Sequence, residues 1–143
     1  MKYKVYENYI LICLEAGDEV INSITQIAIK ENIRFASLTG IGTADKVEMG
    51  FFELKNKDYR KNSLEGEYEL TSLLGNITLK DGKQFVHIHV NISDENYNVY
   101  GGHLFSANVL ATAEIVLNVI DIDIDRKFND DFGLHFWNLS YCK

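Results

Sequence analysis

The sequence predicts an α+β fold, a single domain in which a mostly antiparallel sheet of about seven strands packs with one or two main helices. Three observations predict it. A chain of 143 residues fits one compact domain better than two. Its apolar residues, 46% of the total, are spread evenly along the chain. Segments rich in β-branched and aromatic residues outnumber segments with helical periodicity.

The first elements follow from residues 1–33. Residues 5–15 are rich in Tyr, Ile and Leu and predict a first strand. A signal peptide is not expected here, because no small-residue cleavage site precedes the acidic residues. Asp18 is then a candidate N-cap. Apolar residues at helical spacing from Val20 to Ala28 predict one amphipathic helix that ends near Asn32. No segment approaches the roughly 18 apolar residues of a membrane span, so we expect a cytoplasmic protein.

Strand character then recurs along the chain. There are no prolines, so glycines and polar clusters mark the boundaries. Residues 108–124 stay ambiguous between a short helical turn followed by a strand and one continuous strand. The other predicted strands cover residues 34–43, 46–54, 64–79 with a break at Gly75, 83–92, 98–105 and 135–142.

The charge of the chain argues against nucleic-acid binding. The net charge is −7, whereas a protein that neutralises phosphates needs a basic face. The densest basic group, at residues 55–61, is interrupted by Asp58 and is typical of a solvated loop. We therefore do not expect DNA as a partner on grounds of charge.

Three of the four histidines lie between residues 87 and 103. Because side chains alternate along a strand, His87 and His89 point to one face, about 6.6–6.8 Å apart. A chain reversal near Asn96 would place His103 opposite His89, with β-carbons about 4.5–5.5 Å apart. The glycines at 101–102 would let the second strand bend and admit a ligand close to the backbone. The alternative is a strand with its polar residues outward and His103 unrelated to it.

If the three imidazoles converge, they can hold a zinc ion and leave one tetrahedral position open. A water there could have its pKa lowered to about 7, which would permit hydrolysis. Imidazole sites also accept other divalent transition metals. Glu114 is the candidate carboxylate to support a histidine. His135 stands apart and is interpreted as structural.

Other motifs carry weaker signals. TGIGTAD, residues 39–45, lacks the third glycine of a dinucleotide site and predicts a tight turn between strands, from which Thr43 could line a pocket. DIDIDRK, residues 121–127, would align three carboxylates on one face of a strand, either for Mg²⁺ or Ca²⁺ or as a charged sheet edge. Cys13 and Cys142 are interpreted as reduced thiols, and a disulfide would require the first and last strands to be neighbours.

Four segments together resemble a known family. TGIGTADKVEMGFFE, LEGEYELTSLLGNIT, HIHVNISDENYNVYGGHL and TAEIVL occur in the order seen in the plants and prokaryotes conserved (PPC) domain. The tail DRKFNDDFGLHFWNL is similar to the closing segment of that family. The resemblance covers nearly the whole chain and implies an α+β fold and a homotrimer.

The resemblance also bears on function. It implies a bound metal ion, with zinc as the expected metal and His87, His89 and His103 as its ligands. It also maps the family's TAE glutamate to Glu114. Plant members carry an AT-hook that binds AT-rich DNA, and many prokaryotic members have a DNA-binding label. This chain has no hook and no basic extension, which argues against that role.

These observations leave one leading hypothesis and three alternatives. The leading one is a small, cytoplasmic, trimeric metal-binding protein whose open three-histidine site could receive water or a small-molecule ligand. The alternatives are a hydrolase or lyase that uses metal-bound water with Glu114 as acid or base, a DNA-binding protein, and an assembly module that recruits partners.

Overall fold

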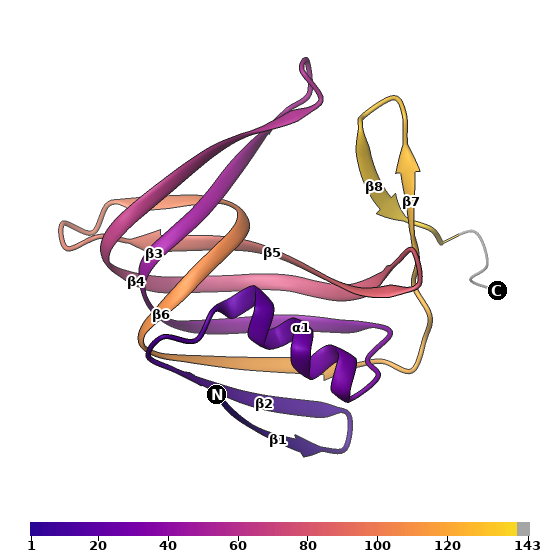
Figure 1. Ribbon diagram of the computed structural model, residues 1–143, viewed down its shortest axis with the longest axis horizontal. Helices are drawn as coiled ribbons and strands as arrows, with labels where there is room; N and C mark the ends of the chain where they lie inside the picture. Colours follow the sequence, from indigo (N-terminus) through magenta and orange to yellow (C-terminus); the bar gives the residue numbers. More distant parts are fainter. Residues whose placement is uncertain (140–143) are drawn as a thin grey trace.

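A computed structural model describes residues 1–139 and shows one helix on a large antiparallel sheet (Figure 1). The sheet order is β1-β2-β6-β3-β4-β5, and β6 also pairs with β5, so that β3, β4, β5 and β6 form a closed ring of pairings. A separate hairpin, β7 and β8, stands beside the sheet near the C-terminus (Figure 1). The elements are β1 Lys2–Tyr6, β2 Tyr9–Glu15, α1 Val20–Lys30, β3 Ala36–Glu53, β4 Asp58–Lys80, β5 Lys83–Ser93, β6 Val99–Val119, β7 Arg126–Asn129 and β8 Leu134–Trp137.

The predicted α+β class is confirmed, with eight described strands instead of about seven. Residues 5–15 contain a turn at Glu7, which adopts a φ of 51° and separates β1 from β2, and β7 was not among the predicted strands. In the other direction, 34–43 and 46–54 join into the single strand β3, and the ambiguous segment 108–124 contributes to one continuous strand, β6, as far as Val119.

The predicted turn at TGIGTAD is wrong. β3 passes through this segment with irregular register next to Gly40 and Gly42. A β-carbon on Gly42 would lie 2.6 Å from the Cα of Ala113 on β6, so the glycine is needed for close approach of two strands. The bulges bend β3 and β6 where the sheet curls into the ring.

Two further boundaries differ from the prediction. Glu19, not Asp18, caps α1: its carboxylate accepts hydrogen bonds from the backbone N–H groups of Ile21 and Asn22 at 3.1 and 2.6 Å. Asp18 instead accepts from the N–H of Glu15 and pairs with the N-terminal amine. The helix ends at Lys30, two residues before Asn32, which has a φ of 50°.

The three aspartates of DIDIDRK do not form a strand face. Residues 120–124 lie outside any strand, and Ile124 is buried while its carbonyl accepts a hydrogen bond from Leu79 N at 2.8 Å. The segment therefore attaches the β7–β8 hairpin to β4 and offers no row of carboxylates. The predicted last strand, 135–142, is present as β8, and its residues 140–142, with Cys142, lie outside the described residues.

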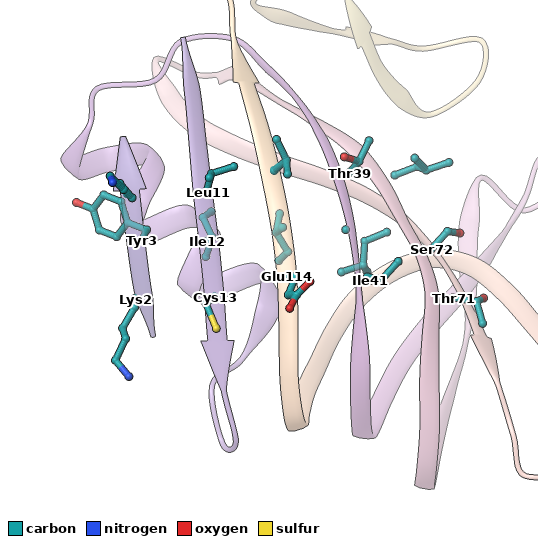
Figure 2. Close-up of a pocket in the computed structure, with 16 residues that line it drawn as sticks. Lys2, Tyr3, Leu11, Ile12, Cys13, Thr39, Ile41, Thr71, Ser72 and Glu114 are labelled. Carbon is teal, nitrogen blue, oxygen red and sulfur yellow. The ribbon is translucent and has the colours of Figure 1, made fainter. Parts of the chain in front are cut away.

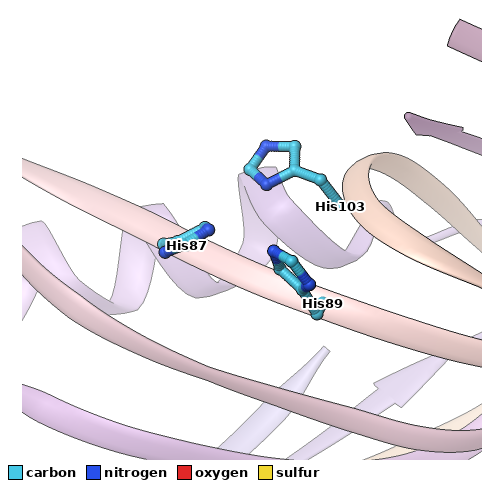
Figure 3. A group of neighbouring side chains, drawn as sticks. All are labelled: His87, His89 and His103. Atoms are coloured by element: carbon cyan, nitrogen blue, oxygen red, sulfur yellow. The ribbon is translucent and has the colours of Figure 1, made fainter. Parts of the chain in front are cut away.

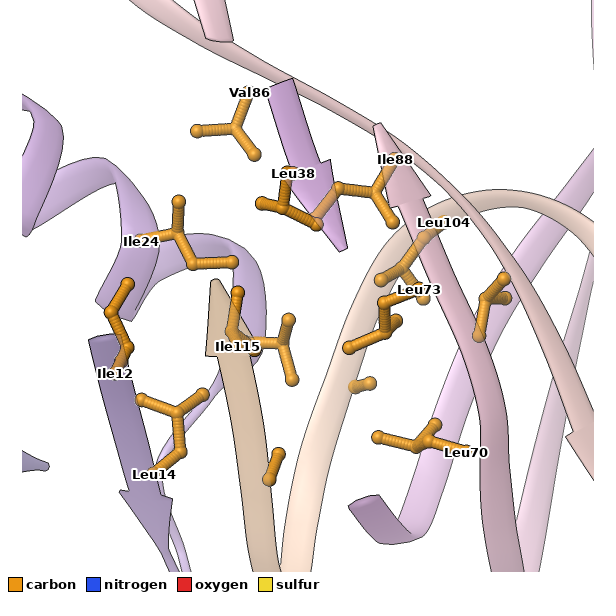
Figure 4. Close-up of a cluster of buried hydrophobic side chains, with 14 of the residues drawn as sticks. Ile12, Leu14, Ile24, Leu38, Leu70, Leu73, Val86, Ile88, Leu104 and Ile115 are labelled. Carbon is orange, nitrogen blue, oxygen red and sulfur yellow. The ribbon is translucent and has the colours of Figure 1, made fainter. Parts of the chain in front are cut away.

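The core lies between α1 and one face of the sheet (Figure 4). β2 shows how the two faces differ, since Ile10, Ile12 and Leu14 are buried and the residues between them are exposed. Ile24 of α1 is fully buried over this layer. Each such side chain contributes about 1.5–3 kcal/mol by leaving water. No helix within residues 1–139 has the length and apolar character needed to cross a membrane.

Gly75 of β4 is tightly enclosed by the strand that carries two histidines. A β-carbon at Gly75 would meet the carbonyl oxygen of His87 at 2.1 Å and the Cα of Ile88 at 2.9 Å. The sequence predicted a break at Gly75, but β4 runs through this residue without interruption. It allows β4 and β5 to approach closely behind the histidines.

We therefore predict that Gly75→Ala lowers the free energy of unfolding by about 2–3 kcal/mol, since the clash is with backbone. Urea denaturation measures the change. Ser37→Ala, at an exposed position of β3 that pairs with Asn76, is the control and should stay within about 0.5 kcal/mol of the wild type. Equal stability of Gly75→Ala and the wild type would contradict the close approach.

Candidate metal centre

Local structure brings the three histidines together. β5 and β6 form a hairpin in which His89 lies directly opposite His103. Asp94 holds the turn, because its Oδ1 accepts hydrogen bonds from the N–H groups of Asn96 and Asn98, both at 2.9 Å. His87, two residues before His89, points to the same face of β5, as the alternation of a strand requires. The chain reversal near Asn96 thus has the predicted register.

The imidazoles form a compact cluster (Figure 3). Their ring centroids are 5.2 Å apart for His87 and His89, 5.0 Å for His87 and His103, and 5.6 Å for His89 and His103. One nitrogen of each ring lies within 4.8 Å of the nitrogens of the other two. Zinc–nitrogen bonds of 2.0–2.1 Å would need nitrogens about 3.3 Å apart, which ring movements on the order of 1 Å would achieve.

The donor set fits a metal. The Nδ1 atom of His103 is buried and has no hydrogen-bond partner among residues 1–139, an arrangement that costs free energy unless something binds the nitrogen. Burial, followed by the charges of neighbouring groups, lowers the pKa of His87 and of His103 to about 4. Both imidazoles are therefore neutral at pH 7, the form that donates a lone pair to a metal.

The histidines lie in a cavity of about 910 Å³ between the sheet and the β7–β8 hairpin. Tyr59 and Phe105 flank His103, with ring centroids 4.9 and 4.8 Å from that of His103. Burial raises the pKa of Tyr59. Trp137 of β8 and Phe85 of β5 also line the cavity, so its walls are largely aromatic.

Arg126, the first residue of β7, reaches the histidines from the other side. Its Nη2 lies 3.2 Å from Nδ1 of His87 and donates to Oδ1 of Asn76 at 2.8 Å. Its Nε donates to Oγ1 of Thr78 at 2.8 Å, and its Nη1 to the carbonyl of His135 at 3.1 Å. These bonds fix the guanidinium over the ring of Phe85, 5.1 Å from the centroid.

The structure does not place Glu114 beside the histidines. Glu114 pairs with Cys13 and Ile41, is exposed, and lines a separate pocket of about 830 Å³ that none of the three histidines lines (Figure 2). Because β6 is one continuous strand, it carries Glu114 far from His103. Thr43 lines neither of these two pockets, and its Oγ1 accepts a hydrogen bond from Ala111 N at 3.0 Å.

Sequence reasoning missed Arg126 and Asn76 as neighbours of the histidines. Asn76 could have been identified from the pairing of neighbouring strands, because β4 pairs with β5 and places Asn76 opposite His87. Arg126 appears in the sequence only as the arginine of the closing segment. His135, interpreted as structural, lines the same cavity and contacts Phe128, with centroids 5.0 Å apart, but is not part of the histidine cluster.

Comparison with solved structures supports the fold at full length. A candidate DNA-binding protein from Bacteroides thetaiotaomicron is similar, with 25% identity, a TM-score of 0.94 and 97% of both chains covered. A plant- and prokaryote-conserved (PPC) protein from Pyrococcus horikoshii has 36% identity and a TM-score of 0.86, with 96% of this chain and 94% of that chain covered. A metal-containing protein from Archaeoglobus fulgidus has 33% identity, a TM-score of 0.85 and 96% of both chains covered.

The family comparison agrees with these structures. None of the curated proteins compared with this chain matches it. The family model described as the Plants and Prokaryotes Conserved (PCC) domain matches residues 1–121, which include all three clustered histidines. The chain therefore belongs to the Plants and Prokaryotes Conserved domain family, as its motifs predicted.

Proposed function

We propose that this chain is a cytoplasmic metal-binding protein in which His87, His89 and His103 hold a zinc ion or another divalent transition metal. The observation that carries the proposal is the cluster itself: three ligand nitrogens within 4.8 Å, with the buried Nδ1 of His103 lacking any described partner. A metal held by three imidazoles would supply a Lewis acid with one position open to water or a small ligand.

Two further observations support this function. The metal-containing protein from Archaeoglobus fulgidus is similar over nearly the whole chain. Within residues 1–139, Asp58 is the only carboxylate that lines the histidine cavity, and its Oδ1 accepts a hydrogen bond from the N–H of Tyr59. A hydrolase or lyase needs an acid or base next to the metal. The scarcity of carboxylates in the histidine cavity thus favours ligand binding over metal-assisted hydrolysis.

We also propose that the protein forms a homotrimer through the outer face of the sheet, the face opposite α1. Leu11, Ile41 and Leu74 are 51%, 57% and 56% exposed there and lie around the pocket that contains Glu114 (Figure 2). Exposed apolar side chains that adjoin one another mark a surface that another protein covers. The family resemblance implies that further copies of this chain cover the outer face of the sheet.

The candidate DNA-binding protein among the neighbours raises a second function, which this chain supports less well. Its net charge is −7. Several of its cationic side chains are already paired with carboxylates, as Lys46 is with Glu65 and Lys61 with Glu48. Binding to phosphates would have to overcome repulsion from the rest of the surface.

Zinc titration followed by calorimetry tests the metal site. The wild type should bind about one zinc per chain, and His89→Ala should weaken binding by at least about 100-fold, because losing a ligand costs more than losing a residue that supports one. His135→Ala is the matched control, since His135 lines the same cavity outside the cluster. A protein that binds no zinc, or a His89→Ala variant with unchanged affinity, would overturn the proposal.

The neutral state of the imidazoles predicts how stability depends on pH. The pKa of His87 and of His103 is about 4 in the folded chain against an ordinary value of 6.5. Between pH 6.5 and 4 the unfolded chain therefore takes up protons on these imidazoles that the folded chain does not. The free energy of unfolding is thus highest above pH 6.5 and falls as the pH decreases towards 4.

With chelator present, the loss should be roughly 1–2 kcal/mol for each imidazole, because partial exposure screens the effect. Urea denaturation at several pH values measures it. The double variant His87→Gln with His103→Gln should show a flatter dependence between pH 6.5 and 4. A slope identical to that of the wild type would mean that these imidazoles do not carry the effect.

Light scattering after size exclusion tests the trimer. The wild type should have three times the chain mass of 16.4 kDa, and Leu74→Glu should give monomers, because it buries a charge in an apolar contact. Ile29→Glu, at a position on α1 that is 60% exposed, should remain trimeric. A monomeric wild type, or a trimer that tolerates Leu74→Glu, would contradict the interface.

A further inference from the structure

We infer that Arg126, together with the three-histidine centre, binds the carboxylate of a small organic acid whose apolar body fills the aromatic cavity. The inference deepens the proposed metal-binding function, on which it rests, by assigning the class of ligand. The observation behind it is a half-buried guanidinium fixed at the histidines without a carboxylate partner.

The charge of Arg126 has no counter-ion within residues 1–139. Its four hydrogen-bond contacts are to Thr78, Asn76, His87 and the carbonyl of His135, all of which are neutral groups. No described ion pair includes it. A partly buried cation of this kind is costly unless an anion joins it.

The hydrogen-bonding capacity of the guanidinium is also incomplete. It has five N–H donors, and four described contacts leave one N–H on Nη1 free. The contact from Nη2 to His87 uses the single lone pair of a neutral imidazole, since a guanidinium can only donate. If His87 binds a metal through its other ring nitrogen, Nε2, then Nδ1 carries the proton and cannot accept, so Nη2 has an N–H free as well.

Arg126 would then offer one donor on each terminal nitrogen, the pair that a carboxylate accepts in the bidentate geometry that arginine favours. The bonds to Thr78 and Asn76 keep the guanidinium in place without using this pair. Such pre-organisation reduces the entropy that binding an anion would cost.

The charge of the whole cavity agrees with an anionic ligand. Among the described residues that line the cavity, the cations are Lys57, Lys80 and Arg126, and the only carboxylate is that of Asp58. None of these four forms a described ion pair. A chain with a net charge of −7 thus has a cavity with an excess of positive charge, which a bound metal would increase.

The shape and walls of the cavity indicate an organic acid and not a free inorganic anion. Its volume of about 910 Å³ is much larger than a phosphate ion needs, and it lies in the range that holds small-molecule ligands. Phe52, Phe85, Phe105 and Trp137 line it, surfaces that favour an apolar or aromatic substituent.

Calorimetric titration of the zinc-loaded protein tests the inference, with phenylacetate as the probe and phenylacetamide and inorganic phosphate as comparisons. Phenylacetate should bind at least about 10-fold more tightly than the neutral amide, since a charge-assisted bidentate pair is worth 1.4 kcal/mol or more. Phosphate binding as tight as that of phenylacetate would show a general anion site and overturn the assignment.

Arg126→Gln should weaken phenylacetate binding by at least about 10-fold, and Arg126→Lys should restore part of it, because lysine keeps the charge and loses the bidentate fork. Arg60→Gln removes an exposed arginine from the same strand that carries Asn76 and should have no effect. Thermal unfolding checks that each variant is folded. Unchanged phenylacetate affinity in Arg126→Gln would overturn the inference.

Zinc content measured on the same samples separates this inference from the proposed function. If zinc binds and phenylacetate does not, the metal site stands and the ligand assignment falls. If zinc does not bind, the metal site falls, and the titration of metal-free protein decides the role of Arg126 by the same comparison of wild type and Arg126→Gln.

Discussion

The antiparallel register between β5 and β6 is the constraint on which the histidine centre depends. A shift by one residue would turn His87 and His89 to the face that holds Val86, Ile88 and Val90, all buried in the core. The register therefore cannot slip without exposing three apolar side chains and burying two imidazoles. The same hydrophobic face that stabilises the sheet thus sets the direction of the histidine side chains.

Glycines allow the strands to come close enough for this arrangement. Gly75 admits the backbone of His87 from one side, and Gly102 admits the carbonyl oxygen of Gly50, which a β-carbon would meet at 2.8 Å. Gly50 is paired with His103. Backbone contacts on both flanks of the cluster hold its strands in place, so the imidazoles project from a rigid framework, which favours a precise ligand geometry.

The parts of the site that could be predicted are those governed by short-range periodicity. Alternation placed His87 and His89 on one face, and the polar turn at Ser93–Asn98 placed His103 opposite His89. Glu114 was misplaced because a count along the chain does not show that β6 continues without a turn. Arg126 was missed because it reaches the cavity from β7, which pairs only with β8 among the described strands, and no local pattern predicts where that hairpin lies.

The surroundings of the histidines bear on whether the proposed metal site would bind a ligand or catalyse a reaction. A catalytic zinc site of the hydrolytic kind places a carboxylate near the open position to move protons, whereas the group fixed beside these histidines is a guanidinium that does not release its proton. Arg126 can attract and orient an anion but cannot act as a base. The cationic, aromatic cavity is therefore better suited to hold an organic acid beside the proposed metal than to activate water, and a reaction there would have to obtain its proton transfer from Asp58, from Tyr59 or from the ligand itself.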